Sequence, residues 1–407
     1  MRSCMSSKKP NTSPVDKGKI HNFFVLSFAL VFVMVAVHPA KAQDSGSEHD
    51  VKQELEKVEE PEKKEAQSWL NRKIHPIFGD KVNLNGAVEL NYEYLDVKDI
   101  DDENSGSSSD FFMSTAELGL RVFFNSWSKA KIVAAAEDVG KQGDDGKVLL
   151  NEAIVTLKSP QAPLYLVAGK TVMPFGVFED HLIEGTLAED LYEIDQWGAT
   201  VGFNPDFYGL DISFSVYRKP QVVENLQNFD THEFRPERQK EDQFKSFIAS
   251  VALEPFEDAL TLNAYFDSEP GDGHRNQSIG GAFSLHYWKF ILDAEYITAL
   301  DREKGENGEE NKESAGVVGL AFDLLDSLQL ATRYEVFSDG NRGDQDEVLD
   351  YRIITGFNYS LLDLINADFL NDMTLSFEYR YSKYEKEIDS EAANSQNMFQ
   401  FQLAFEF

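Results

Sequence analysis

The stretch Phe399-Gln400-Phe401-Gln402-Leu403-Ala404-Phe405-Glu406-Phe407 has a large apolar residue at every second position and a polar or small residue between. Successive side chains of a β-strand point to opposite faces of the sheet. In a helix the apolar positions would instead recur every three to four residues. The stretch therefore predicts a strand with one apolar face and one polar face.

The same period of two recurs from Lys81 onward and predicts sixteen strands. In the second strand, Phe112 and Leu118 are expected on the apolar face and Glu117 on the polar face. The expected strands cover residues 82–94, 112–124, 129–138, 147–158, 163–170, 195–204, 208–218, 243–254, 259–268, 277–287, 289–299, 313–323, 327–337, 348–359, 372–384 and 396–407.

Short connections alternate with long ones, as turns and loops do at the two ends of an outer-membrane barrel. Because lipid offers no partners to exposed backbone groups, such a sheet must close on itself. We therefore predict an all-β fold, a transmembrane antiparallel up-and-down β-barrel. A soluble propeller or double sandwich is the alternative. Aromatic residues near the strand ends fit interfacial girdles: Tyr92, Tyr94, Phe111, Phe124, Trp127, Phe203, Tyr208, Tyr287, Trp288 and Tyr384.

Composition narrows the function classes. The chain has 407 residues and a formal net charge of −33, from 71 acidic and 38 basic side chains. This acidic excess argues against nucleic-acid binding, which depends on Lys and Arg. The single cysteine, Cys4, excludes a disulfide framework and a thiolate zinc cluster. No apolar run reaches the roughly 18 residues that a membrane-spanning helix needs.

The N-terminal region has the pattern of a secretory signal. A basic stretch precedes the apolar run 23–37, and a small-x-small sequence ends at Ala42. We expect cleavage between Ala42 and Gln43, with a retained membrane anchor as the alternative. Cleavage removes six basic side chains and one acidic side chain, which takes the charge from −33 to −38.

Three regions follow from these patterns. Residues 1–42 are the expected signal peptide, residues 43–80 a charged periplasmic segment, and residues 81–407 the barrel. Within the charged segment, Val51, Leu55 and Val58 would share one helix face, so a short coiled coil is the alternative to a solvated linker.

Barrels of about 16 to 18 strands are wide enough to leave an aqueous channel. Arg333, Arg352 and Arg380 fall on three successive expected strands, all in lumen-facing phase. Acidic residues such as Asp293 and Glu295 have lumen-facing phase on another strand. A basic strip that faces acidic walls would create a transverse field across the pore. The alternative is that these residues form ordinary salt bridges in the wall.

Catalytic and metal chemistry have little support, and no cofactor is expected. Ser284 and His286 lie two residues apart on one strand, about 6.5 to 7 Å along the axis, which is unfavourable for a catalytic pair. His181 follows Glu179 and Asp180, but three nearly adjacent residues do not converge on a metal ion as ligands do. We therefore predict neither an enzyme nor a metal site.

The segment Gly169-Lys170-x-x-x-Pro174-Phe175-Gly176-x-Phe178, with an acidic stretch after it and then Trp197-Gly198-Ala199-Thr200-Val201-Gly202-Phe203, resembles the LbtU-type siderophore porins of Gram-negative outer membranes. The phosphate-selective porin group has a similar motif. The matching positions are Gly169, Lys170, Pro174, Phe175, Gly176 and Phe178. The sequence departs from the family at Glu184-Gly185-Thr186-Leu187, where a stretch more like Asp-Pro-Leu-Thr is expected.

The resemblance implies uptake of a ferric siderophore or a similar bulky solute, without a plug domain. In porins a long third loop folds inward and narrows the channel, and the Gly, Pro and apolar residues of the loop 171–194, which contains His181, indicate the same course here. A surface loop is the alternative. Phe405 and Phe407 resemble the terminal signal that the barrel assembly machinery reads. Outer-membrane lipid and lipopolysaccharide are further expected partners, and a homotrimer is a common assembly of such porins.

Two other functions stay open at this point. One is a general or anion-selective diffusion porin, although the acidic charge argues against a phosphate channel, which needs clustered Lys and Arg. The other is a structural or adhesive barrel whose loops contact partners.

Overall fold

The computed structural model describes residues 76–98, 105–143, 146–179, 181–205, 207–228, 244–256, 259–271, 274–304, 312–340, 349–362, 370, 372–384 and 394–407. The expected signal peptide, its cleavage site and residues 43–75 of the charged segment lie outside the described residues. A single 3-10 turn, η1 (Gly79–Lys81), leads directly into the first strand.

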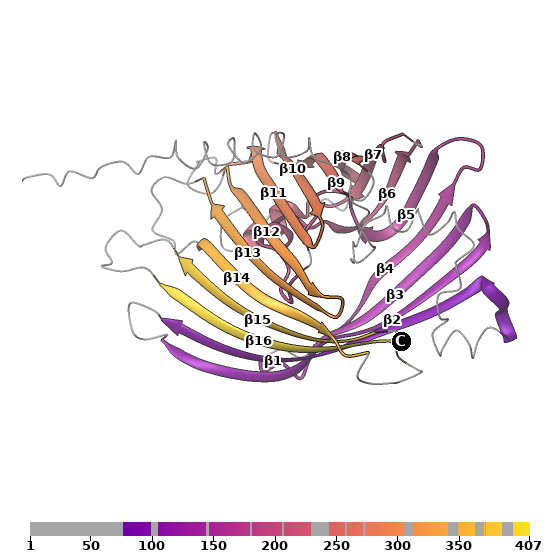
Figure 1. The fold of residues 1–407 in the computed structure, drawn as a ribbon. Coiled ribbons are helices and arrows are strands. Elements are labelled where there is room, and N and C mark those ends of the chain that lie inside the picture. The colour runs from indigo at the N-terminus through magenta and orange to yellow at the C-terminus, as the bar shows by residue number, and fades with distance from the viewer. Residues whose placement is uncertain are drawn as a thin grey trace, which may run out of the picture. The chain divides into compact units, whose positions relative to one another are not determined.

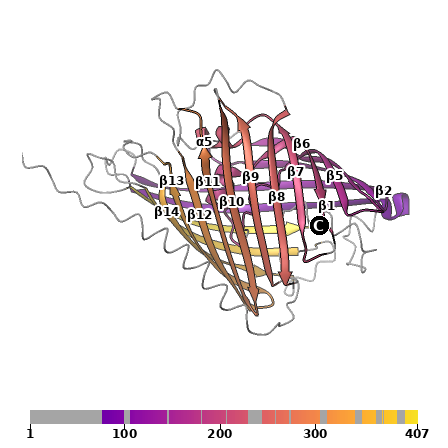
Figure 2. The same ribbon diagram turned by 90° about the horizontal axis from the view of Figure 1, so that it is seen from above.

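Sixteen antiparallel strands form one closed barrel in which each strand pairs with its neighbours in sequence. Figure 1 shows the first strands, in purple, meeting the last, in yellow, and Figure 2 shows the long neighbouring strands from above. The predicted fold class and strand count are confirmed. The strands are β1 (Val82–Lys98), β2 (Gly106–Asn125), β3 (Ser128–Val139), β4 (Lys147–Lys158), β5 (Leu164–Val172), β6 (Asp195–Phe203), β7 (Asp211–Arg218), β8 (Phe244–Phe256), β9 (Leu260–Pro270), β10 (Arg275–Tyr287), β11 (Phe290–Asp301), β12 (Ser314–Leu325), β13 (Leu328–Ser338), β14 (Leu349–Ser360), β15 (Asp372–Tyr384) and β16 (Ser395–Glu406).

The barrel closes where β16 pairs with β1. Phe405 lies opposite Val88 and Phe401 opposite Tyr92, so apolar residues of both strands share one face. The backbone N–H and C=O groups of Phe407 bond those of Gly86 in both directions, at 2.9 Å. These pairs leave no open sheet edge at the seam, as a strand in lipid requires. The role of Phe405 and Phe407 as an assembly signal stays a prediction.

The outer surface of the barrel is apolar. Leu118 on β2 and Val201 on β6 are each 54% exposed, which soluble proteins rarely allow for contiguous large apolar residues. Among the described residues, no helix is both long enough and apolar enough to cross a membrane. All but one of the expected girdle aromatics, Tyr384 being the exception, are exposed: Tyr92, Tyr94, Phe111, Phe124, Trp127, Phe203, Tyr208, Tyr287 and Trp288.

One predicted side-chain direction is wrong. Phe112 was expected on the apolar outer face, but it is 4% exposed, whereas Phe111 is 65% exposed. The pairing of β1 with β2 slips by one residue, because Glu89 lies opposite Thr115 while Leu90 lies opposite Met113. A β-bulge of this kind inserts an extra residue and reverses the phase of the strand beyond it.

Part of the barrel interior is a packed apolar core rather than open lumen. Its members come from the segment between β5 and β6, from a helix after β7, and from inward positions of the wall. Wall residues such as Ile297, Val317 and Phe337 contribute from β11, β12 and β13. The interior is therefore divided between a dry region and a polar one.

Gly169 is essential to β5 in this structure. Its φ is +143°, and an added Cβ would lie 1.9 Å from the carbonyl oxygen of Ala153 on β4. We expect Gly169→Ala to lower the melting temperature and the yield of folded barrel, because backbone strain of about 1–3 kcal/mol adds to that clash. Heat-modified mobility on gels and far-UV circular dichroism measure both effects.

The matched control is Gly106→Ala at the start of β2, where no atom lies within 4 Å of the added Cβ. This variant should fold as the parent does. A Gly169→Ala protein with the parent's melting temperature would contradict the backbone conformation described for this position.

Candidate functional site

The candidate site is built around residues 173–194, which we call the constriction segment. It leaves β5 at Met173 and returns to β6 after Ile194, and these two residues bond through their backbones at 2.8 Å. Gly176 has a φ of +96°, and an added Cβ there would meet the ring of Phe178 at 2.1 Å. Phe175 is fully buried. Glycine at this turn therefore lets both aromatic rings pack inward.

The constriction segment contains one short helix, α4 (Leu187–Tyr192). Thr186 and Glu189 form a reciprocal capping box, which satisfies backbone donors at the start of the helix. Leu187, Leu191 and Tyr192 are almost fully buried in the interior core. Burying one such leucine contributes about 1.5–3 kcal/mol, against at most about 1 kcal/mol for an exposed ion pair, so packing is the main force that holds α4 in place.

Carboxylates of the barrel wall accept backbone N–H groups of the constriction segment. Glu295 on β11 accepts from Val177 and Phe178, at 2.9 and 3.1 Å. Glu335 on β13 accepts from Leu187 at 3.0 Å. The wall also supplies Glu378 on β15, which accepts from Glu184 at 3.1 Å. Because the three acceptors come from different strands, these contacts fix the backbone of the segment against the wall.

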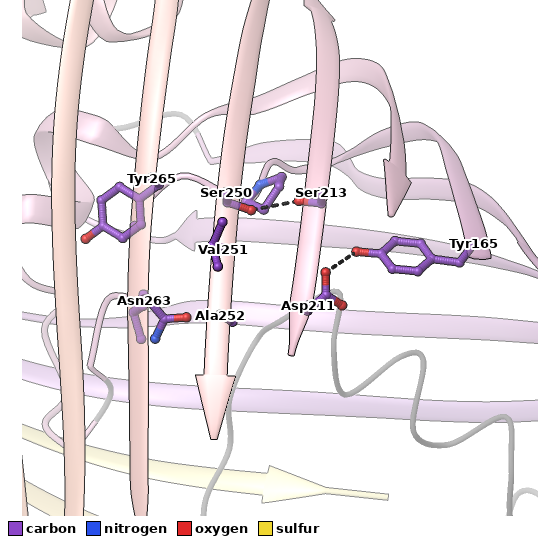
Figure 3. Close-up of a pocket in the computed structure, with 11 residues that line it drawn as sticks. Tyr165, Asp211, Ser213, Ser250, Val251, Ala252, Asn263 and Tyr265 are labelled. Carbon is purple, nitrogen blue, oxygen red and sulfur yellow. Dashed lines mark hydrogen bonds between the residues drawn. The ribbon is translucent and has the colours of Figure 1, made fainter. Parts of the chain in front are cut away.

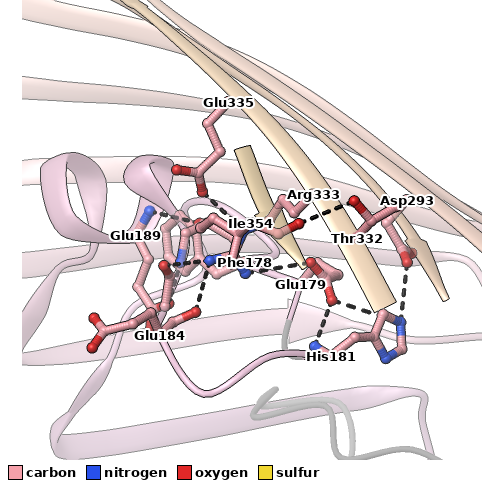
Figure 4. A network of polar contacts seen from close by, with 12 residues as sticks. Phe178, Glu179, His181, Glu184, Glu189, Asp293, Thr332, Arg333, Glu335 and Ile354 are labelled. Atoms are coloured by element: carbon pink, nitrogen blue, oxygen red, sulfur yellow. Dashed lines mark hydrogen bonds and ion pairs between the residues drawn. The ribbon is translucent and has the colours of Figure 1, made fainter. Parts of the chain in front are cut away.

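The three predicted arginines also hold the constriction segment. Arg333 donates to the carbonyl oxygens of Glu184 and Gly185, both at 2.7 Å. Figure 4 shows Arg333 between the segment and Glu335, with which it forms an ion pair at 2.9 Å.

The other two arginines lie on β14 and β15. Arg352 pairs with Glu335 at 2.5 Å and with Asp190 on α4 at 3.2 Å. Arg380 lies 3.4 Å from Glu184. The structure thus brings the arginines together as ion pairs with acidic partners. The pairs of Arg333 and Arg352 with Glu335 lie within the wall, whereas those with Asp190 and Glu184 join the wall to the segment, so a selective role for the arginines stays a prediction.

The remaining residues of the motif lie around the ends of β5. Lys170 forms an ion pair with Asp195 at the start of β6. Pro174 lies beside the interior core, at the edge of a polar recess in the wall. Figure 3 shows that recess, where the Tyr165 hydroxyl group donates to Asp211 and the Ser213 and Ser250 hydroxyl groups bond each other.

A second inward element was missed by sequence analysis. Helix α5 (Val222–Asn228) follows β7 and packs into the interior core through Val222, Val223 and Leu226. The carboxylate of Glu269 on β9 accepts the backbone N–H groups of Val222 and Val223, at 3.0 and 3.2 Å. Apolar residues at i, i+1 and i+4 directly after Pro220 were the available signal.

The wall of β1 to β4 and β16 is polar on its inner face. Lys131 and Glu152 form an ion pair at 2.7 Å, with side chains 19% and 16% exposed. Ser114 and Gln402 both donate to Glu89, each at 3.2 Å. The hydrogen bonds from the backbone of the constriction segment to wall carboxylates go to β11, β13 and β15.

Acidic groups border the constriction segment on its exposed side. Burial raises the pKa of the Glu193 carboxyl to about 7, and the neighbouring carboxylates of Asp195 and Asp190 raise it as well. Burial also raises the pKa of Asp190, although the Arg352 guanidinium opposes this effect. The charge of the constriction therefore changes near neutral pH.

His286 and His181 contact residues that sequence analysis did not place in contact with them. His286 Nε2 lies 3.1 Å from Ser284 Oγ. The two side chains are therefore in contact, although their spacing of about 6.5 to 7 Å along the strand axis had suggested that they would be apart. Within the described residues no carboxylate orients His286, which leaves the pair without the third member of a catalytic triad. His181 Nε2 lies 3.2 Å from Asp293 on β11, and Asn358 donates to the His181 carbonyl oxygen at 3.0 Å.

Several solved structures share this architecture. The anion-selective porin from Comamonas acidovorans has 13% identity and a TM-score of 0.56, over 80% of this chain and 99% of that chain. The chain has a porin fold. The outer membrane channel DcaP of Acinetobacter baumannii has 14% identity and a TM-score of 0.56, over 80% and 97% of the two chains.

Salmonella typhi OmpF, solved in complex with daunomycin, has 15% identity and a TM-score of 0.55, over 81% and 98% of the two chains. No protein-family model and no curated protein matches the sequence. The comparisons therefore support the porin fold, and the LbtU-type likeness remains a resemblance of motifs.

Replacing Arg352 tests the docking of α4. Arg352→Ala should enlarge the single-channel conductance and change the ion preference, because Asp190 loses the guanidinium that holds it to β14. Glu335 keeps its ion pair with Arg333, so the wall should stay folded. Planar lipid bilayers with a KCl gradient give both quantities.

The control is Arg275→Ala, since Arg275 bonds Ser268 and the Lys245 carbonyl oxygen, away from α4. Its conductance should equal that of the parent. If Arg352→Ala leaves both conductance and ion preference unchanged, the ion pair has no part in shaping the pore.

Glu193 gives the constriction a pH dependence. Its pKa of about 7 makes it neutral below that pH and charged above it, so preference for cations should fall as the pH is lowered from 8 to 6. In bulk water two unit charges about 5 Å apart interact by about 0.8 kcal/mol, so we expect a change of about fourfold in the permeability ratio. Reversal potentials at several pH values measure the change.

Glu193→Gln should remove this step. Glu224→Gln on α5 is the control, because that carboxylate is 37% exposed and paired with Lys219. A step of the same size in Glu193→Gln would assign the titration to another group.

Proposed function

We propose that this chain is an outer-membrane channel that admits bulky solutes past the constriction segment. The apolar outer surface fits lipid, and the closed seam leaves no unpaired strand edge. A barrel of this strand number is wide enough for an aqueous passage. The porin fold of the similar solved structures agrees with this function.

The position of the constriction segment is the observation that carries the proposal. Its backbone is bonded to β11, β13 and β15 by Glu295, Glu335 and Glu378. The opposite inner wall has polar groups that are partly exposed, such as Lys131 and Glu152. A passage between this wall and the acidic side of the segment would be polar on both sides.

We propose a ferric siderophore or a similar bulky solute as the cargo. The support is the resemblance of the motif at Gly169 to Phe178 to the LbtU-type siderophore porins. In the structure, Gly169 and Gly176 have positive φ and set the path of the constriction segment. Motif residues thus shape an inward element that a solute in the lumen would meet.

A general or anion-selective diffusion porin is the second candidate. The solved porin from Comamonas acidovorans is described as anion-selective. In this chain the arginines of the lumen are paired with acidic groups, which weakens their pull on anions. A structural or adhesive barrel is the third candidate, and it needs no conducting passage.

The proposed partners follow from the same fold. They are outer-membrane lipid and lipopolysaccharide around the apolar surface, and the barrel assembly machinery at Phe405 and Phe407. We also propose that three copies associate as a homotrimer, and we propose no nucleic-acid partner. Detergent-solubilised protein analysed by light scattering would show whether three copies associate.

Uptake of radiolabelled iron separates the cargo proposals. A deletion strain should take up less of at least one ferric siderophore, and a plasmid copy of the chain should restore uptake. The purified protein should also open stable ion-conducting channels in planar bilayers. Undiminished uptake of several siderophores, together with channel conductance, would exclude a siderophore channel and support a general porin. Protein that folds and inserts without conducting would favour the structural barrel.

A further inference from the structure

Three potential metal ligands converge in the lumen, although two of them are far from the third in sequence. His181 Nε2 lies 3.2 Å from Asp293 Oδ2 and 3.8 Å from Glu179 Oε1. One ligand atom from each residue lies within 4.8 Å of the others. Figure 4 shows Glu179 and His181 on the constriction segment, with Asp293 approaching from β11.

These separations are close to those of a bound ion. Zn²⁺ binds imidazole nitrogen and carboxylate oxygen at about 2.0–2.2 Å, so ligand atoms of a tetrahedral site lie about 3.4 Å apart. The two measured distances to His181 Nε2 lie on either side of that value. The Glu179 and Asp293 oxygens lie within 4.8 Å of each other, so rotation of the carboxylates would bring all three groups to one ion.

The surroundings hold the ligands in place. Glu179 Oε1 accepts the backbone N–H of His181 at 2.5 Å, and its Oε2 lies 3.6 Å from Arg333 Nη1. Gly319 on β12 leaves room for that carboxylate, since an added Cβ would lie 3.0 Å from Oε2. Asn358 bonds the His181 backbone. Such second contacts orient ligands in metal sites.

The three side chains are largely buried but keep some accessible surface. Their exposed fractions are 8% for Glu179, 18% for His181 and 14% for Asp293. An ion could therefore enter from the lumen and keep a water molecule as its fourth ligand. The positive charge of Arg333 would repel the ion, but Glu335, 2.9 Å from Arg333, partly neutralises that charge.

We propose that Glu179, His181 and Asp293 bind a divalent transition-metal ion, with Zn²⁺ the best match. One imidazole and two carboxylates suit Zn²⁺, whereas Mg²⁺ prefers oxygen ligands alone and six-fold geometry. The bound ion links the constriction segment to β11. It also adds positive charge beside the passage, which lowers cation permeation.

Calorimetric titration of the purified, folded barrel with ZnCl₂ tests the proposal. We expect saturable binding of one ion per chain, and at least about tenfold weaker binding in His181→Ala and in Asp293→Asn. A large excess of Mg²⁺ should not compete. In planar bilayers, Zn²⁺ should reduce the conductance of the parent protein and not that of either variant.

His286→Ala is the matched control, because this lumen histidine contacts Ser284 and belongs to no such cluster. It should bind Zn²⁺ as the parent does. His181→Gln, with heat-modified mobility as the folding check, guards against loss of structure in the alanine variant. No saturable binding by the parent, or equal binding by folded His181 and Asp293 variants, would overturn the proposal and leave His181 in contact with the two carboxylates alone.

Discussion

Wall carboxylates that accept backbone N–H groups are the contacts on which the interior of this barrel depends. A segment that turns into a barrel loses water from its backbone, and each buried N–H group then needs an acceptor. Glu295, Glu335, Glu378 and Glu269 supply these acceptors from four different strands. Without them, these backbone N–H groups of the constriction segment and of α5 would lack the acceptors described here, although apolar packing would still favour the inward position.

These hydrogen bonds change what the net charge of the chain implies about the lumen. A net charge of −33 suggests a lumen that attracts cations along its whole length. Several of the inward carboxylates are instead committed to backbone donors or to arginines. Glu335, for example, accepts from Leu187 and also pairs with Arg333 and Arg352. The charges that can act on solutes include Lys131 and Glu152 on the opposite wall and Glu193 in the constriction segment.

The same contacts divide the interior into two functional parts. Phe175, Leu191 and Tyr265 belong to a dry core that fixes the constriction segment against one side of the wall. The inner face of β1 to β4 and β16 stays polar, with groups such as Lys131 and Gln402. A rigid element opposite a polar wall is the arrangement that a selective passage needs.

The strands could be predicted from sequence because their period of two is local and each turn interrupts it. The sequence also indicated Arg333, Arg352 and Arg380 as lumen residues, and the inward course of the loop after β5. The bulge that reverses Phe112 could not be predicted, since it depends on pairing with β1. Nor could the meeting of His181 with Asp293, because 112 positions separate them and only closure of the barrel brings them together.

The two faces of β16 differ, with lipid on one and the polar lumen on the other. Spin labels on single cysteines introduced in turn at positions 399 to 404, in lipid bilayers, distinguish the two faces. We expect high oxygen accessibility at 399, 401 and 403, where Phe399 and Phe401 are exposed, and contact with a water-soluble relaxation agent at 402 and 404. Accessibility without a period of two, or apolar positions shielded from both lipid and water, would contradict this arrangement.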